Sequence, residues 1–439
     1  MMYNPEIETL HRDKLRQLQN ERLQETLQRV YTQVPFYQKQ FKERGLKPAD
    51  IKGVEDLHKL PFTKKDDLRA HYPFGLFAVP QKEVVRIHAS SGTTGKPTVV
   101  GYNRHDLAVF DEVIARSLVT AGAKPGMKLH NAYGYGLFTG GLGMHGGATQ
   151  LGMAVIPVSG GMTERQLMIL QDFRPEVICC TPSYAQTLGQ EMQKRGIDPN
   201  TLALRYAILG AEPWTEAIRS EVEQLLPVSA TNIYGLSEII GPGVSQEDWE
   251  EKGSGSYIWE DHFFPEVVDK DTGEPLPYGQ EGVLVFTTLT KQALPILRYW
   301  TNDICSIYYD PDAKRTHIKM SSIKGRADDM LIIRGVNLFH TQVEVLLEDF
   351  AEVTPNYQLI VSREGTMDQV KLALEVDQKL SSVSIQAFAE QEAIRNLSHQ
   401  VSKRIKDNIG LSMQVELLPK DSIPRSAGGK LSRINDLRK

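Results

Sequence analysis

A run of small and hydroxyl-bearing residues that ends in a lysine carries the most evident chemistry of this sequence. Residues 88–98 read His-Ala-Ser-Ser-Gly-Thr-Thr-Gly-Lys-Pro-Thr. Small residues let backbone N–H groups turn toward an anion, while hydroxyl groups add donors and a lysine adds a compact charge. The side chains that could bind an anion are those of Ser90, Ser91, Thr93, Thr94 and Lys96. We therefore predict that this loop binds a polyphosphate.

The spacing of this loop differs from that of two common nucleotide-binding loops. A Walker loop has a glycine five positions before its Gly-Lys pair and Ser or Thr directly after the lysine. Here Ser90 takes the first position and Pro97 follows the lysine. The kinase pattern G-x-G-x-x-G is also missing, and the absence of G-x-S-x-G disfavours a hydrolase.

Four further stretches of the chain join the loop in a recognisable order. They are Tyr234-Gly235-Leu236-Ser237-Glu238, Arg298-Tyr299-Trp300-Thr301-Asn302-Asp303, Gly325-Arg326-Ala327-Asp328-Asp329 and Pro424-Arg425-Ser426-Ala427-Gly428-Gly429-Lys430. In this order they resemble the motifs of the adenylate-forming superfamily. Residues 133–141, 210–214 and 259–263 are similar to phenylacetate–coenzyme A ligases, and the resemblance covers roughly residues 5–439.

The resemblance implies a reaction and an architecture. The reaction joins a small aromatic acid (phenylacetate, or a benzoate- or anthranilate-type acid) to coenzyme A, using ATP and Mg²⁺, through an acyl-adenylate and with release of AMP. The implied α/β fold has a large N-terminal adenylate-forming domain of layered sheets and helices, residues 1–326. A small C-terminal α+β domain, residues 327–439, would rotate about a hinge. The resemblance also implies a homodimer.

The resemblance further assigns nucleotide-binding roles to single residues. The phosphate-binding residues are those of the loop described above, and the adenine-side residues are Gly210, Ala211, Glu212, Asn232, Tyr234, Gly235 and Ser237. Glu238 would bind Mg²⁺, which commonly takes one carboxylate with phosphate oxygens and water. Asp303 would accept both ribose hydroxyl groups, and Arg326 would reach the ribose or phosphate side from the hinge. Without its neighbours, Glu238 would be interpreted as an acid at a helix N-terminus.

Two residues near the C-terminus are assigned to catalysis and to domain movement. Lys430 would bring a cation to the α-phosphate during adenylation, where charge builds in the transition state. Asp328 would be the pivot, since hinges absorb backbone change at a few residues. The rival interpretation of Lys430 is a solvated lysine near the C-terminus, and that of Asp328 is an exposed linker acid.

The acid pocket is assigned by the same resemblance to Tyr133, Phe138, Ile233 and Pro242. An apolar pocket with aromatic walls suits a small planar acid. Three positions depart from the family: Asn232 replaces a usual Asp, Met144 a usual Ala, and Gly146 a frequent Tyr. The Asn232 oxygen can still accept from the adenine amino group, so we expect ATP binding to persist. The other two could change the preferred acid or could be packing around the pocket.

Composition limits the remaining possibilities. The chain has 439 residues, 41% of them hydrophobic and 24% charged, which fits two or more globular domains. A net charge of −5 gives no indication of nucleic acid, and no apolar run is long enough for a membrane span. Three cysteines make no disulfide framework, so a cytoplasmic location is expected. His262 and His317 lack thiol partners at ligand spacing, so we expect no structural zinc.

Hydrophobic patterning predicts the elements that would position these residues. Residues 5–45 have helical spacing, and short apolar runs alternate with helical patterns from 85 to 325, which favours α/β layers. The phosphate loop follows a strand at 84–88, where open α/β sheets usually bind ligands. Strands at 359–361, 370–376 and 414–418 and a helix across 383–408 predict a small α+β unit at the end.

Two other functions stay open. An adenylating enzyme could load the pantetheine of a carrier protein, and an assay without coenzyme A would separate it from a coenzyme A ligase. A non-catalytic nucleotide-binding regulator is the alternative from another class. Lys96, Glu238, Asp303 and Lys430 argue against it, while absence of acid-dependent pyrophosphate exchange would favour it.

Overall fold

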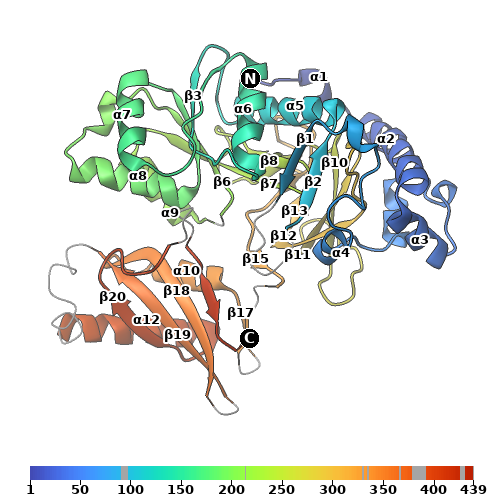
Figure 1. The fold of residues 1–439 in the computed structure, drawn as a ribbon. Helices are drawn as coiled ribbons and strands as arrows, with labels where there is room; N and C mark the ends of the chain where they lie inside the picture. The colour runs from blue at the N-terminus through green and yellow to red at the C-terminus, as the bar shows by residue number, and fades with distance from the viewer. Residues whose placement is uncertain are drawn as a thin grey trace. The chain divides into compact units, whose positions relative to one another are not determined.

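The computed structural model describes residues 1–89, 97–212, 214–328, 331–333, 336–364, 367–377, 392–425 and 431–438. The chain divides into two compact units, one of Met1–Ala211 with Val222–Ile323 and one of Glu212–Glu221 with Lys324–Lys439 (Figure 1). The functional division that the sequence predicts, at residue 326, stays a prediction. None of the described helices combines the length and apolar character needed to cross a bilayer.

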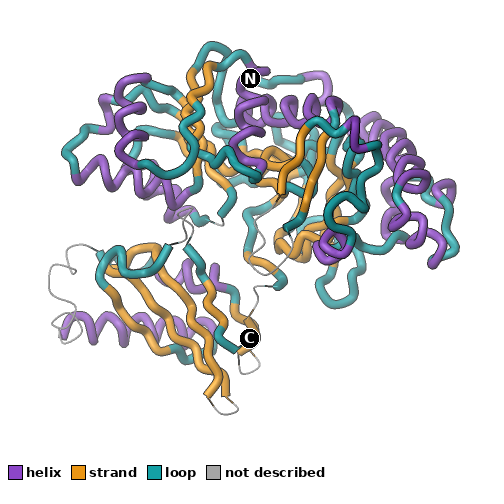
Figure 2. The backbone as a smooth tube through the Cα atoms, viewed as in Figure 1, coloured by secondary structure: helices purple, strands orange, loops and turns teal. Residues whose placement is uncertain are grey.

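A nine-stranded sheet forms the centre of the first unit, in the order β13-β14-β9-β8-β7-β6-β5-β3-β4. Its strands are β3 (Lys128–Asn131), β4 (Ala154–Ile156), β5 (Val177–Cys180), β6 (Tyr206–Gly210), β7 (Ser229–Leu236), β8 (Gly241–Glu247), β9 (Ser256–Ile258), β13 (Ile307–Tyr308) and β14 (Lys319–Met320). Strands β3 to β7 run parallel. Helices connect them, as parallel pairing requires, and Figure 2 shows these helices flanking the strands. This confirms the predicted α/β alternation.

Two smaller antiparallel sheets complete the strands of this unit. One contains β10 (Phe263–Val268), β11 (Gly282–Thr288) and β12 (Tyr299–Cys305). The other is the pair β1 (Arg86–Ala89) and β2 (Val99–Tyr102). The expectation that the phosphate loop follows a strand of the open α/β sheet is therefore wrong. The connection from β1 to β2 is too short for a parallel crossover, so the chain turns back and pairs with itself.

Helices cover this unit on several sides. They are α1 (Pro5–Glu8), α2 (Arg12–Gln33), α3 (Pro35–Glu43), α4 (Lys65–Ala70), α5 (Arg104–Thr120), α6 (Thr139–Leu151), α7 (Thr163–Phe173), α8 (Pro182–Lys194) and α9 (Glu216–Leu225). The first part of α9 belongs to the second unit. The short 3₁₀ turns are η1 (Pro48–Asp50), η2 (Val54–Lys59), η3 (Gln81–Glu83) and η4 (Pro199–Thr201). Helices α5 and α6 pack closely because glycines face the contact. A Cβ atom at Gly143 would lie 2.3 Å from the ring of Phe110, and one at Gly147 would lie 2.3 Å from Ile114.

A buried ion pair joins α5 to the segment before β10. The guanidinium of Arg116 donates to both carboxylate oxygens of Asp261, at 2.8 and 3.0 Å, and both side chains are 1% exposed. Burial opposes ionisation of Asp261, but the charges of His262 and Arg116 hold its pKa below the ordinary value. The pair is ionised and fully desolvated, so loss of one partner would leave an uncompensated buried charge.

We expect Arg116→Met to lower the free energy of unfolding by about 3–5 kcal/mol, the usual cost of breaking a buried ion pair from one side. Urea denaturation followed by circular dichroism measures this change. Arg195→Met is the matched control, because Arg195 pairs with Glu191 on the surface of α8. The control should leave the denaturation midpoint almost unchanged, and equal losses in both variants would contradict the assignment.

The second unit is a small α+β structure. Its main sheet has the order β20-β19-β18-β21, with β18 (Val353–Glu364) antiparallel to β19 (Met367–Val376) and with β21 (Ile434–Asp436) and β20 (Gln414–Leu418) parallel to their neighbours. The other elements are β15 (Gly325–Arg326), β16 (Leu331–Ile333), β17 (Val336–Leu338), α10 (His340–Leu347) and α12 (Glu392–Ile409). Helix α12 lies along one face of the sheet in Figure 1 and buries Ile394, Leu397, Val401 and Ile405. The helix that the sequence predicts over 383–408 is described from 392 onward.

Candidate active site

The turn between β7 and β8 carries the residue that the sequence assigns to magnesium. Glu238 is only 5% exposed, and its neighbour Ser237 lies 3.1 Å from the hydroxyl group of Thr139, the first residue of α6. The ammonium of Lys65 is 4.0 Å from a carboxylate oxygen of Glu238. Within the described ranges, no hydrogen-bond donor contacts that carboxylate. A buried carboxylate with open coordination positions fits a hard divalent cation.

The described residues contain no group of three or more His, Cys, Asp and Glu side chains placed to hold a metal ion. A magnesium site does not need such a group when one carboxylate acts with substrate phosphates and water. The expectation that the protein has no structural zinc stays a prediction, which elemental analysis would check.

The residues assigned to adenine and ribose lie next to each other. The phenol of Tyr234, on β7, donates a hydrogen bond of 2.6 Å to Asp303, on β12, across 69 positions of sequence. Asp303 is 6% exposed, and its backbone N–H donates to Thr301 at 2.9 Å. The bond joins the nine-stranded sheet to the antiparallel sheet. An aromatic face and a carboxylate are thus held together, and these are the groups that a nucleoside needs.

We expect Tyr234→Phe to raise the KM for ATP about tenfold, because the carboxylate of Asp303 loses a charge-assisted hydrogen bond that fixes its position. Steady-state kinetics at saturating acid and coenzyme A measure this effect. The KM for the acid should stay within about twofold of the wild-type value. An unchanged KM for ATP would show that the bond has no role in the nucleotide site.

The end of β6 has a steric role that the sequence interpretation missed. A Cβ atom at Gly210 would lie 2.3 Å from the carbonyl oxygen of Ile233, so glycine is required where β6 meets β7. Ala211 follows in the left-handed region with φ of 67°. Glu212 is half-buried and belongs to the second unit. Asn232 is half-buried on β7, where its backbone N–H donates to Glu247 at 2.9 Å.

The acid-pocket candidates come from two segments. Tyr133 and Phe138 both border Gly140, since a Cβ atom there would lie 3.4 Å from Tyr133 and 2.9 Å from the ring of Phe138. Ile233 is buried on β7, and Pro242 on β8 pairs with Gly235 on β7. A Cβ atom at that same Gly235 would lie 1.9 Å from the carbonyl oxygen of Gly241, so the strands are close there.

The two segments meet at the start of α6. The contact between Thr139 and Ser237 places the residue after Phe138 beside the turn that follows β7. A Cβ atom at Gly241, which precedes Pro242, would lie 3.1 Å from the Cβ of Thr139. The structure thus brings residues 133–138, which we call the aromatic segment, to the same turn as Glu238. The role of these residues in binding an acid stays a prediction.

The two departures from the family pattern on α6 differ in their surroundings. Met144 is fully buried in the same apolar core as Tyr133 and Ile233. A Cβ atom at Gly146 would lie 1.9 Å from the carboxylate of Asp111 on α5. Gly146 therefore leaves room for the carboxylate of Asp111, which would have to move if this position carried a side chain.

The hinge candidates bind each other. The guanidinium of Arg326 donates to both carboxylate oxygens of Asp328 at 2.9 Å, and both side chains are exposed to solvent in part. Both belong to the second unit.

Six of the predicted site residues lie outside the described residues. They are Ser90, Ser91, Thr93, Thr94 and Lys96 of the phosphate loop, and Lys430. The described ends of the loop are the strands β1 and β2. At the end of β1, His88 is buried and contacts the carbonyl oxygen of Leu137 at 3.0 Å. The aromatic segment therefore lies beside the base of the phosphate loop.

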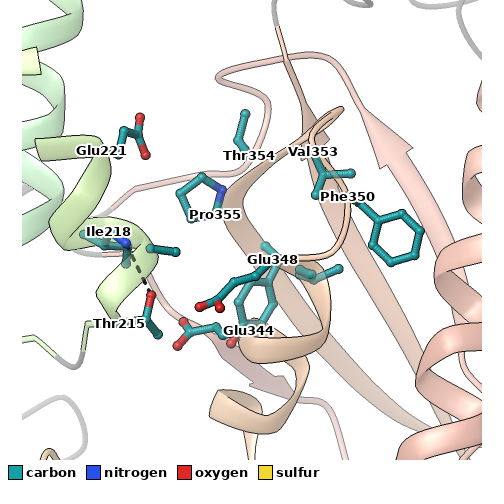
Figure 3. A pocket seen from close by; sticks show the side chains of 12 residues that line it. Thr215, Ile218, Glu221, Glu344, Glu348, Phe350, Val353, Thr354 and Pro355 are labelled. Atoms are coloured by element: carbon teal, nitrogen blue, oxygen red, sulfur yellow. Dashed lines mark hydrogen bonds between the residues drawn. The ribbon is translucent and has the colours of Figure 1, made fainter. Parts of the chain in front are cut away.

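Figure 3 shows a cavity of about 160 Å³ in the second unit. Its lining comes from residues 215–221 and 344–357 and includes Glu344, Glu348 and Phe350. None of the predicted site residues lines it.

Sequence reasoning missed the side chains that hold the Glu238 turn. Lys291 is 2% exposed, and its ammonium donates to the carbonyl oxygen of Glu238 at 3.1 Å. Tyr102 is buried and its phenol donates to the carbonyl oxygen of Ile240 at 2.8 Å. Burial lowers the pKa of Lys291 to about 8, while the charges of Asp106 and Glu238 act to raise it. No spacing signal marks either residue, because their partners lie far away in the sequence.

Comparison with known proteins identifies the family of the chain. Residues 12–290 match the family described as AMP-binding enzyme, and residues 335–438 match the AMP-binding enzyme C-terminal domain. A phenylacetate-coenzyme A ligase of Thermus thermophilus is 61% identical over the full length of both chains. One from Escherichia coli (strain K12) is 49% identical, over 98% of this chain and 97% of its own.

Solved structures of related enzymes share the fold of this chain. A 2-hydroxyisobutyryl-CoA ligase in a postadenylation state, in complex with 2-HIB-AMP, has a TM-score of 0.90 and 27% identity, over 98% of this chain and 91% of its own. An anthranilate CoA ligase in complex with anthranoyl-AMP has a TM-score of 0.59 at 18% identity, over 79% of this chain and 65% of its own, and shows likeness of fold alone. The chain therefore belongs to the adenylate-forming AMP-binding enzymes, within the family of the phenylacetate–coenzyme A ligases.

Proposed function

We propose that the protein is an ATP-dependent, AMP-forming ligase that joins a small aromatic carboxylic acid to coenzyme A. The observation that carries this proposal is the hydrogen bond between Tyr234 and Asp303, with Glu238 four residues after the tyrosine. Two motifs that are distant in sequence meet there and offer an aromatic face, a ribose acceptor and a metal ligand. The names of the relatives support the aromatic acid and coenzyme A as substrates.

In the first half-reaction, the acid carboxylate attacks the α-phosphate of ATP and pyrophosphate leaves. Tyr234 would stack on adenine and Asp303 would hold the ribose, which fixes the α-phosphate relative to the acid. The hydroxyl groups of Thr93 and Thr94 and the ammonium of Lys96 would bind the β- and γ-phosphates. Magnesium, held by Glu238, would offset phosphate charge when bound. Lys430 would stabilise the charge that builds on the α-phosphate oxygens.

In the second half-reaction, the coenzyme A thiolate attacks the acyl carbon and AMP leaves. The thiol must reach a carbon that the first half-reaction kept enclosed. We propose that the second unit turns about Asp328 between the two steps, so that Lys430 withdraws when the thiol enters. Opening of the pair between Arg326 and Asp328 would accompany this movement.

The acid itself is identified by AMP release with a panel of phenylacetate, benzoate and anthranilate, each with and without coenzyme A. The proposal expects one of these acids to support release of AMP that depends on coenzyme A. A carrier protein that replaces coenzyme A would favour the carrier-loading alternative. Absence of acid-dependent pyrophosphate exchange with every acid would contradict the ligase proposal.

We also propose a homodimer, which rests on the resemblance, and a cytoplasmic location, which rests on cysteine usage. Analytical ultracentrifugation over a range of protein concentrations tests the first. A sedimentation coefficient that corresponds to 49.3 kDa at every concentration would contradict it.

A further inference from the structure

The turn that carries Glu238 is held at two points by side chains from elsewhere in the chain. The ammonium of Lys291 donates to the carbonyl oxygen of Glu238, and the phenol of Tyr102 donates to the carbonyl oxygen of Ile240. The Lys291 ammonium also lies 5.0 Å from the centre of the Tyr102 ring, within the range of a cation–π contact. We call this pair, Lys291 and Tyr102, the turn clamp.

The lysine of the turn clamp is itself held in place, through hydrogen bonds to the two residues that follow it. Asp106, in the first turn of α5, is fully buried and accepts hydrogen bonds from the backbone N–H groups of Gln292 at 2.6 Å and Ala293 at 2.9 Å. Asp106 also closes a capping box with Asn103, so its carboxylate is anchored to the start of the helix. The backbone that follows Lys291 cannot shift without breaking these bonds. The ammonium of Lys291 is therefore held against the carbonyl oxygen of Glu238 by a fixed backbone.

A buried ammonium costs more than an apolar side chain of equal volume would, so its presence needs a reason. The ammonium of Lys291 bonds the carbonyl oxygen of Glu238, and the Tyr102 ring that it faces lies 5.7 Å from the ring of His88, on the strand that precedes the phosphate loop. Lys291 is thus close to the two segments to which metal and phosphates are assigned. A cation there stabilises a nearby carboxylate and a nearby polyanion.

We propose that Lys291 and Tyr102 are positioning residues for the nucleotide site, which fix the turn so that Glu238 can present its carboxylate to magnesium and ATP. This inference rests on the proposed assignment of Glu238 to magnesium. Neither residue touches the nucleotide, and both act through the backbone of residues 238–240. The rival possibility is that they contribute only to packing of the core.

The experiment compares variants of the full chain by titration calorimetry with ATP at several Mg²⁺ concentrations. Lys291→Met removes the charge and the bond to Glu238 while keeping most of the length of the side chain, and we expect the Kd for ATP at saturating Mg²⁺ to rise about tenfold. Tyr102→Phe removes one hydroxyl group, and we expect a rise of about threefold. The Mg²⁺ concentration for half-saturation should rise in both variants, while the KM for the acid stays unchanged.

Two matched controls separate positioning from packing. Lys319 is another buried lysine, 1% exposed, which binds Glu251 at 3.1 Å and Asp310 at 2.9 Å. Tyr257 is another buried tyrosine, whose phenol donates to Glu251 at 2.7 Å. Lys319→Met and Tyr257→Phe are expected to lower the melting temperature without changing the affinity for ATP. If the controls weaken ATP binding as much as the clamp variants do, the inference is wrong.

A third arm separates this inference from the function on which it rests. Glu238→Gln should weaken binding of ATP in the presence of Mg²⁺, and its failure to do so would overturn the metal assignment. If Glu238→Gln weakens binding while Lys291→Met and Tyr102→Phe bind ATP as the wild type does, the turn clamp alone is overturned. Should Lys291→Met fail to fold, Tyr102→Phe decides, because it loosens the same turn and leaves the charge in place.

Discussion

Glu238→Gln is expected to slow formation of the acyl-adenylate by at least about a hundredfold, because a neutral amide is a poor ligand for magnesium and leaves phosphate charge uncompensated in the transition state. The substitution changes one oxygen to nitrogen and keeps volume, so the fold should persist. Acid-dependent exchange of labelled pyrophosphate into ATP measures the step directly. Excess Mg²⁺ should restore part of the rate, since a weaker site fills at a higher concentration.

The control for this prediction is the second half-reaction. Thioester formation from preformed acyl-adenylate needs no pyrophosphate chemistry, so Glu238→Gln should leave it within about threefold of the wild-type rate. A melting temperature close to that of the wild type excludes unfolding as the cause. Equal losses in both half-reactions would show that Glu238 maintains the site as a whole and does not act through a metal.

Lys430→Ala is expected to slow adenylation by about a hundredfold or more and to spare thioester formation from preformed acyl-adenylate. The reason is electrostatic: a cation aimed at the α-phosphate oxygens acts where charge develops, and removal of such a group commonly costs a factor of 10² to 10³, roughly. Lys430 lies outside the described residues, so the prediction rests on the motif at 424–430. Single-turnover experiments with each half-reaction separate the two effects.

The nearby Lys420 offers a comparison variant for this lysine. It belongs to the described part of the second unit and lies outside the motif. Lys420→Ala should leave both half-reactions near the wild-type rate, which excludes a general effect of lowering the positive charge of this unit. If Lys430→Ala impairs thioester formation as strongly as adenylation, its assignment to the first step alone is wrong.

The sequence predicted the layered α/β fold because the parallel strands are continuous apolar runs separated by helical patterns. Strand β5, with Cys179 and Cys180, is buried at all four positions, as a strand covered on both faces must be. The strand predicted at 84–88 is present as β1 but belongs to a different sheet, because the apolar run before the phosphate loop looks the same whether its partner strand is parallel or antiparallel. Only the length of the connection distinguishes the two cases.

The sequence predicts part of the candidate site. The difference between the residues that it predicts and those that it misses has a physical reason. Tyr234, Glu238 and Asp303 lie in short motifs whose residue order can be read directly. Lys291 and Tyr102 act through backbone carbonyl groups far along the chain, and such contacts leave no pattern of residue types near either partner. The need for glycine at position 210 has the same origin, because it depends on the carbonyl group of a neighbouring strand.

Ion pairs in the core of the first unit were also beyond sequence reasoning. Arg315 is 1% exposed and donates to Glu8 and Asp248, at 2.6 Å in each case. Arg315 lies in a polar stretch that looks like a surface loop, and its partners are 307 and 67 positions away. Charged residues that meet only after folding cannot be distinguished from solvated ones by composition.

A crystal structure of the protein with ATP and Mg²⁺ tests the assigned nucleotide site most directly. We expect adenine against the ring of Tyr234, the ribose hydroxyl groups on Asp303, and the phosphates between the loop of residues 90–96 and Glu238. A nucleotide bound elsewhere, with Tyr234 and Asp303 still bonded to each other and free of contact with it, would contradict the assignment of this site.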